Sequence, residues 1–207
     1  MAKVDYKKEM KELYSPSTKE VAEVVVPKMN FLMIDGKGDP NTSQEYIDSI
    51  QTLYPVAYTI KFAIKKSTGL DFGVMPLEGL WWSDDMSDFT AGKKDNWQWT
   101  SMIMQPDVVT REIFEKAVAD VKAKNPPAGG PASIDKIRFE SYDEGQAAQI
   151  MYIGSYSEEG PTIKRIHEKI LSGGGKLSGK HHEIYLSDPR KADPKKLKTV
   201  IRQPFKE

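Results

Sequence analysis

The sequence predicts an α+β fold made of a duplicated strand-helix-strand-strand module, with a pseudo-two-fold axis and two antiparallel sheets flanking a ligand cleft. Two observations lead to this prediction. Runs rich in β-branched and aromatic residues alternate with helical apolar periodicity, in the same order twice along the 207 residues. Short motifs also match at corresponding places of the two copies: residues 31–36 with 149–154, 77–81 with 182–186, and 101–106 with 199–204.

The first module follows a Lys- and Glu-rich N-terminal arm, residues 1–20. A capping-box pattern at residues 42–45 opens its helix, Pro55 is expected to kink that helix, and Gly69 ends it. Polar residues 83–96 read as a loop between its last two strands. The expected elements are a strand over 24–34, bent near Pro27, a helix over 42–69, and strands over 72–82 and 97–104.

The second module repeats this order after a helix that begins at Thr110 and a Pro- and Gly-rich linker, residues 125–131. Its expected elements are strands over 137–142 and 146–155, a helix that begins at Pro161 and ends at Gly173, and strands over 181–188 and 197–205. We therefore expect one domain over residues 21–207, made of repeats at about 21–106 and 134–207 joined by residues 107–133.

The amino-acid composition limits the classes of partner that the chain is expected to bind. Thirty basic residues balance 30 acidic ones, so the chain lacks the basic field that nucleic-acid binding requires, and no nucleic-acid partner is expected. No apolar run approaches the roughly 20 residues that span a bilayer, so no membrane partner is expected. The absence of cysteine excludes thiolate chemistry and favours a cytoplasmic protein. The oligomeric state stays open.

The segment His181–Asp188 carries the first candidate for chemistry. Period-two alternation places Glu183 and Tyr185 on one face of a short strand, and His182 and Ile184 on the other. A carboxylate among aromatic and aliphatic side chains needs a partner, a raised pKa or a cationic ligand if that face is buried. The alternative for Glu183 is a solvated carboxylate at a strand end.

Other candidates come from the repeat and from the aromatic residues. Glu78 occupies the position equivalent to the second glutamate, although it could simply pair with a lysine. Trp81 and Trp82 are adjacent, so their side chains point to opposite faces of a strand and one of them can line a cleft. Trp99 could form an aromatic wall, and ordinary core packing is the alternative for it.

No metal site and no cofactor are expected. His181 and His182 are adjacent in sequence, which is a poor spacing for chelating one metal ion, and no cysteine is present. The Gly-rich segment 173–175 follows a helix instead of preceding one, so it ends that helix and does not form a phosphate cradle.

Four segments carry a resemblance to a known family. They are Leu77–Trp82, Gln149–Tyr156, His182–Asp188 and Arg202–Pro204. With them the chain resembles the GyrI-like small-molecule-binding domains, related to the effector domains of multidrug-responsive transcription regulators. It is most similar to the stand-alone branch, and the resemblance extends from about residue 20 to the end.

The resemblance implies a hydrophobic cleft that binds bulky lipophilic compounds, cationic or polycyclic, with Glu183 inside it. Some stand-alone members are hydrolases of cyclopropane-bearing natural products that use a glutamate and a tyrosine. By motif position these would be Glu183 as general base and Tyr152 as its assistant, with Trp81 or Trp82 among the walls. Sequestration or sensing of a ligand and its hydrolysis thus remain as two hypotheses. A third, inhibition of a topoisomerase, lacks the acidic surface that would mimic DNA.

Overall fold

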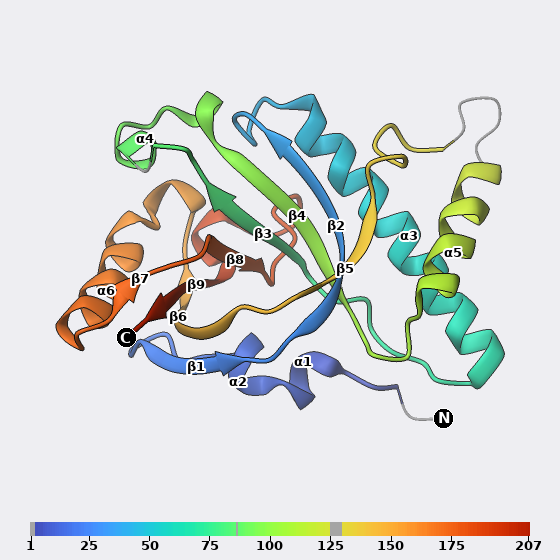
Figure 1. Cartoon of the computed structure of the whole chain (residues 1–207), viewed down its shortest axis with the longest axis horizontal. Helices are drawn as coiled ribbons and strands as arrows, with labels where there is room; N and C mark the ends of the chain where they lie inside the picture. Colours follow the sequence, from blue (N-terminus) through green and yellow to red (C-terminus); the bar gives the residue numbers. More distant parts are fainter. Residues whose placement is uncertain (1–2, 86, 125–129) are drawn as a thin grey trace. The chain divides into compact units, whose positions relative to one another are not determined.

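The structure is a computed structural model that describes residues 3–85, 87–124 and 130–207 (Figure 1). Its helices are α1 (Tyr6–Glu9), α2 (Lys11–Tyr14), α3 (Gln44–Thr68), α4 (Ser87–Thr90), α5 (Arg111–Ala123) and α6 (Gly160–Ser172), with 3-10 turns η1 (Lys94–Asn96), η2 (Tyr156–Glu158) and η3 (Pro194–Lys196). Its strands are β1 (Ala22–Val26), β2 (Met29–Lys37), β3 (Leu77–Trp82), β4 (Gln98–Gln105), β5 (Arg138–Tyr142), β6 (Gly145–Ile153), β7 (Lys176–Leu177), β8 (His181–Tyr185) and β9 (Lys198–Lys206).

The chain forms two compact units that interleave along the sequence. Unit 1 consists of residues up to 6, 29–75 and 81–142, and unit 2 consists of residues 7–28, 76–80 and 143–207. Unit 2 contains β6, α6, β8 and β9 in the order expected for the second module, whereas β5, expected in that module, belongs to unit 1 and the chain crosses from unit 2 to unit 1 within β3. The mixed helical and antiparallel architecture confirms the α+β fold class, whereas the pseudo-two-fold axis and the cleft stay predictions.

In unit 1, β2 pairs antiparallel with β4 on one side and with β5 on the other. Helix α3 packs on β2 and β4, and α5 packs against α3 (Figure 1). The buried apolar residues of α3 follow the i, i+3, i+4, i+7, i+11 spacing of one helix face: Leu53, Val56, Ala57, Ile60 and Ile64. Ser43 caps this helix by accepting a hydrogen bond from the Tyr46 amide at 3.3 Å.

Gly36 of β2 shows how closely this unit is packed. It lies opposite Trp99 of β4, whose side chain is completely buried. A Cβ atom added at Gly36 would lie 2.2 Å from the Trp99 ring, so only glycine allows the indole to cross the strand here.

In unit 2, β6 pairs antiparallel with β1 and β9, and β9 pairs antiparallel with β8 and with the short β7. Helix α6 covers one face of β6 and β9. Ile166 and Ile170 of α6 are buried there in a cluster with residues of both strands: Ala148, Ile150, Ile201 and Phe205. The N-terminal segment also belongs to this unit, with Leu13 and Tyr14 of α2 buried at 4% and 2% exposure.

Several expected boundaries differ in the structure. The strand expected over 24–34 is divided at Pro27 into β1 and β2, because proline lacks the amide proton that a strand ladder needs. The two strands belong to different units. Helix α3 starts one residue later than its capping pattern indicated, with Ser43 as the cap, and it continues through Pro55 to Thr68. Residues 125–129 of the expected linker lie outside the described residues. Among the helices that the structure describes, none has the length and apolar character needed to cross a bilayer.

Candidate functional site

On the face of unit 2 that α6 covers, the side chains of Tyr152, Thr199 and Tyr185 lie in one row. Thr199 of β9 pairs with Tyr152 of β6 on one side and with Tyr185 of β8 on the other. Directly paired residues of neighbouring strands point to the same face, and so do residues two apart on one strand. Glu183 therefore shares this face with both tyrosines, as the alternation in the sequence indicated for Tyr185.

Glu183 is held by its neighbours on the same strand. The Tyr185 hydroxyl donates to Glu183 Oε2 at 2.8 Å, and His181 Nε2 donates to Glu183 Oε1 at 3.1 Å. The Glu183 side chain is 15% exposed, so its carboxyl group is fixed but remains in contact with solvent. The two hydrogen bonds thus fix the orientation of the carboxylate.

A second carboxyl group, from Glu159, lies next to Glu183. Glu159 directly precedes α6 and is only 4% exposed, and its buried Oε1 has no hydrogen-bond partner among the described residues. Burial and the charge of Glu183 raise the pKa of Glu159 to about 9. The N-terminus of α6 acts in the opposite direction, but a helix dipole contributes at most about 2 kcal/mol to a buried group, about 1.5 pKa units, which is less than the rise to about 9.

Tyrosine rings surround this pair of carboxyl groups. The Tyr156 and Tyr185 rings meet edge to face, with centroids 5.6 Å apart, and Tyr156 is 40% exposed. Burial and the charges of Glu159, Glu183 and Asp188 raise the pKa of Tyr156 to about 12, so its phenol stays protonated at neutral pH. Two exposed or half-exposed aromatic rings beside a carboxylate form a surface on which an aromatic cation can stack.

Tyr152 is turned away from Glu183 in this structure. Its hydroxyl donates to the Ser155 carbonyl at 3.0 Å, and its ring folds over Gly154, where a Cβ atom would lie 2.3 Å from the hydroxyl oxygen. Gly154 also has a positive φ of 156°. Burial raises the pKa of Tyr152, and the negative charges of Glu159 and Glu158 raise it further. The hydroxyl that contacts Glu183 belongs instead to Tyr185.

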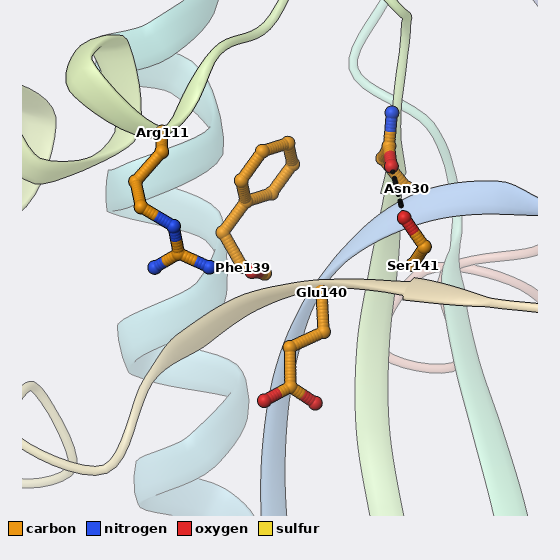
Figure 2. A pocket seen from close by; sticks show the side chains of 5 residues that line it. All are labelled: Asn30, Arg111, Phe139, Glu140 and Ser141. Atoms are coloured by element: carbon orange, nitrogen blue, oxygen red, sulfur yellow. Dashed lines mark hydrogen bonds between the residues drawn. The ribbon is translucent and has the colours of Figure 1, made fainter.

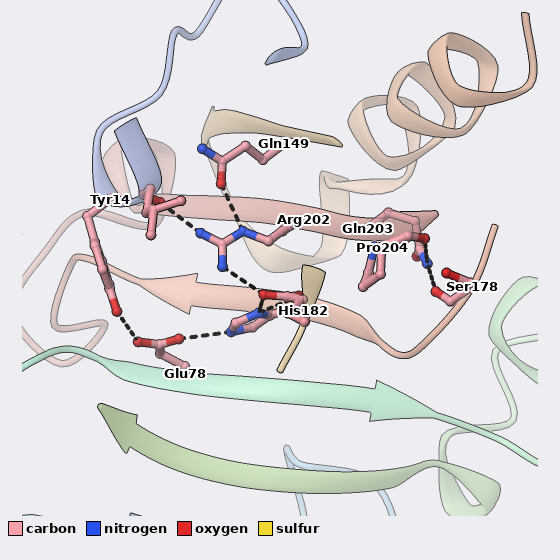
Figure 3. Close-up of polar contacts among 10 residues, drawn as sticks. Tyr14, Glu78, Gln149, Ser178, His182, Arg202, Gln203 and Pro204 are labelled. Atoms are coloured by element: carbon pink, nitrogen blue, oxygen red, sulfur yellow. Dashed lines mark hydrogen bonds and ion pairs between the residues drawn. The ribbon is translucent and has the colours of Figure 1, made fainter. Parts of the chain in front are cut away.

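Glu78 lies on the opposite face of the unit 2 sheet, in a buried ionic network (Figure 3). The side chain of Glu78 is fully buried and accepts hydrogen bonds from the Tyr14 hydroxyl and from His182 Nε2, both at 2.9 Å. His182 Nδ1 contacts Glu144 Oε1 at 2.9 Å. The sequence-based alternative of a lysine partner for Glu78 is therefore wrong, because a histidine and a tyrosine occupy both of its oxygens.

The same network continues to Arg202, which is 1% exposed. Its guanidinium donates to Glu144 Oε2, to Gln149 Oε1 and to the Leu13 carbonyl at 2.8–2.9 Å. Burial alone would lower the pKa of His182, but the charge of Glu144 and the hydrogen bonds to Glu144 and Glu78 outweigh it and raise that pKa to about 9. Burial alone would raise the pKa of Glu144, but His182 and Arg202 lower it to about 2. Two acids and two bases thus compensate one another inside the unit.

The tryptophan residues belong to the aromatic core of unit 1. Trp99 is 0% exposed and Trp81 is 5% exposed, and the ring of Tyr46 contacts both, with centroids 5.1 and 5.7 Å away. Trp82, at the end of β3, is half-buried. Of the three indoles, Trp82 therefore presents the most surface, and a ligand-binding role for any of them stays a prediction.

A pocket of about 380 Å³ lies elsewhere in unit 1, along β5 (Figure 2). Arg111 beside it donates to the Phe139 carbonyl at 2.9 Å, and Ser141 donates to Asn30 Oδ1 at 2.7 Å. Because these polar groups are already hydrogen-bonded within the protein, they are less available to a ligand than the paired carboxyl groups of unit 2.

Residues 19–206 match the family described as GyrI-like small molecule binding domain. The chain belongs to the GyrI-like family. Two solved structures from Listeria innocua, an uncharacterized conserved protein and a hydrolase, are each 40% identical to this GyrI-like chain, and the matches cover 98% of this chain and 100% of theirs. Their TM-scores are 0.89 and 0.84.

The GyrI-like fold also occurs in the EcmrR C-terminal domain, which is 14% identical and matches with a TM-score of 0.56 over 91% of this chain and 98% of that one. This likeness concerns the fold alone. Among curated protein sequences, no match was found. Membership confirms the resemblance based on the four sequence segments, and it identifies the GyrI-like chain as a small-molecule binding domain.

Sequence reasoning missed Glu159, although it lies next to the predicted Glu183. Its only sequence signal is a carboxylate placed before Gly160 and Pro161 at a helix start, which is an ordinary position for an acidic residue. It also missed Glu144 and Arg202, because nothing local marks the hairpin loop and the last strand as ionic partners.

Proposed function

We propose that this protein binds a bulky lipophilic cation or polycyclic compound beside Glu183. The observation that carries the proposal is a carboxylate held in place by Tyr185 and His181 next to the exposed ring of Tyr156. A flat ligand gains stacking energy on the tyrosine rings, and a positive charge gains about 0.5–2 kcal/mol over such rings. The carboxylate adds charge complementarity and disfavours anions. Trp99 is omitted from the candidate ligand contacts because its side chain is completely buried.

The test is a comparison of Glu183→Gln with the wild type in tryptophan fluorescence titrations. A singly charged rhodamine ester is expected to bind the variant at least tenfold more weakly, since a hydrogen bond or contact to a charged group contributes about 1.5–3 kcal/mol. Binding of uncharged pyrene should change by less than about twofold. The control is Glu168→Gln, which removes an exposed carboxylate of α6 that pairs with Lys164. Equal dye affinity in all three proteins would contradict the proposal.

Hydrolysis is the second candidate, because a Listeria innocua protein that matches this chain at 40% identity is described as a hydrolase. The proposed substrate bears a cyclopropane ring conjugated to a carbonyl group. Glu183 would take a proton from water, whose oxygen attacks a ring carbon while the ring carbon–carbon bond breaks. The released electron pair moves to the carbonyl oxygen, which then takes a proton, so the product equals the substrate plus one water. Tyr152 would assist after leaving the Ser155 carbonyl, and Tyr185 already contacts Glu183.

Mass spectrometry of such a substrate after incubation distinguishes binding from hydrolysis. We expect a mass gain of one water with the wild type and a loss of roughly 100-fold or more in rate with Glu183→Gln, the scale of losing a general base. Tyr152→Phe and Tyr185→Phe, compared side by side, identify the assisting hydroxyl. Saturable binding of an unchanged compound would limit the function to sequestration or sensing.

A further inference from the structure

We propose that Glu159 is a second carboxyl group of the Glu183 site and that it holds a proton at neutral pH, so that the pair carries one negative charge and prefers ligands with one positive charge. Only the ligand preference rests on the proposed function. The proton itself can be tested without any ligand.

The first argument is the place of Glu159 in the fold. Its side chain is 4% exposed, it directly precedes α6, and its buried Oε1 has no hydrogen-bond partner in the part of the chain that the structure describes. An ionised carboxylate with an unsatisfied buried oxygen is strongly disfavoured, whereas a protonated one supplies its own donor. The Thr199 hydroxyl beside it acts to lower the pKa of Glu159, but burial and the charge of Glu183 outweigh this effect.

The second argument is the set of charges that face this carboxyl group. Glu183 of β8 is the charged group that acts on it, and the adjacent Glu158 is bonded to Ser155. The titratable phenols of Tyr152 on β6 and Tyr156 on η2 also face it, and both remain neutral. His181 of β8 is already bonded to Glu183, and burial together with His181 lowers the pKa of His167 on α6. Two carboxylates at close range in this setting cannot both ionise at neutral pH.

The third argument concerns the ligand. Both oxygens of Glu183 are bonded to neighbouring side chains, those of Tyr185 and His181, so the proton of the pair is assigned to Glu159 and one negative charge is left to complement a ligand. The site then matches a flat compound with one positive charge. A doubly charged ligand would require the second carboxyl group to ionise first.

Infrared spectroscopy of the protein without ligand tests the proton. The carbonyl band of a protonated carboxyl group is expected at pH 7 in the wild type and in Glu158→Gln, and it should be absent in Glu159→Gln. In the wild type it should disappear as the pH rises through about 9. Glu158 is the matched control because it is the adjacent glutamate and is bonded to Ser155. Identical spectra of the three proteins at pH 7 would overturn the proposal.

Titration with the rhodamine ester tests whether Glu159 belongs to the ligand site. The wild-type affinity should rise roughly tenfold between pH 7 and pH 10, as the pair gains a second negative charge, and that of Glu159→Gln should change by less than about twofold. A titrating infrared band with a dye affinity that does not depend on pH would refute a role at this site. If the dye fails to bind the wild type at any pH, the proposed ligand class is wrong, and the infrared band alone still decides the proton on Glu159.

Discussion

Replacing Arg202 by Met is expected to lower the free energy of unfolding by about 3–5 kcal/mol, the range observed when one partner of a buried ion pair is removed. Arg202 is 1% exposed and neutralises a network with two buried glutamates and one histidine. Without the guanidinium, the charge of Glu144 is only partly compensated and the carbonyl of Leu13 loses its donor. Urea unfolding followed by circular dichroism measures this loss.

Arg138→Met is the matched control for this experiment. Arg138 also contacts two carboxylates at 2.9 Å, those of Asp35 and Glu140, but its side chain is 30% exposed and both acids are more than half exposed. Surface ion pairs contribute about 0–1 kcal/mol, so the control should lose no more than that. Equal losses in the two variants would show that burial of the Arg202 network does not matter for stability.

Glu159→Gln is expected to stabilise the protein at pH 8 by about 2–4 kcal/mol, an unusual direction for a substitution of a buried residue. The folded protein keeps a proton on Glu159 up to about pH 9, whereas the unfolded chain loses it near the ordinary value of 4.5. Between these values the folded state binds more protons, so stability falls as the pH rises. The full linkage over the 3.5 units from pH 4.5 to pH 8 is roughly 5 kcal/mol, which is an upper bound.

Gln keeps the size of the side chain and carries no charge, so this penalty disappears in the variant. The measurement is the difference in unfolding free energy between variant and wild type at pH 5 and at pH 8. The difference should grow with pH, while Glu158→Gln should stay within about 0.5 kcal/mol of the wild type at both values. The raised pKa of His182 also lowers stability as the pH rises through about 9, but it does so equally in both proteins and cancels. A difference that is the same at pH 5 and pH 8 would contradict the expectation.

A site that costs stability in this way is typical of a functional site, because binding requires charged or polar groups in places where apolar ones would be more stable. The two ionic clusters of unit 2 differ in this respect. In the network around Arg202, acids and bases compensate one another and tie the N-terminal segment to the sheet. In the pair Glu183 and Glu159, two acidic side chains lie together beside an exposed tyrosine ring. A cationic ligand would reduce the electrostatic repulsion between them.

The sequence by itself determined the α+β class, the family and the order of the longer helices and strands. These follow from local rules, since apolar periodicity and turn residues act within a few positions of one another. The same rule placed Glu183 and Tyr185 on one face, and the structure shows their hydrogen bond, because residues two apart on a strand are neighbours whatever the rest of the chain does.

Only the tertiary structure decided which distant groups meet. Tyr14 reaches Glu78 across 64 positions, and His182 reaches Glu78 across 104, so no local pattern could have paired them. Glu159 joins Glu183 because α6 begins over the sheet at that point, and Tyr152 bonds to Ser155 because Gly154 lets its ring fold back. Burial sets the pKa values of these groups, and burial is a property of the packed molecule that a sequence displays at no single position.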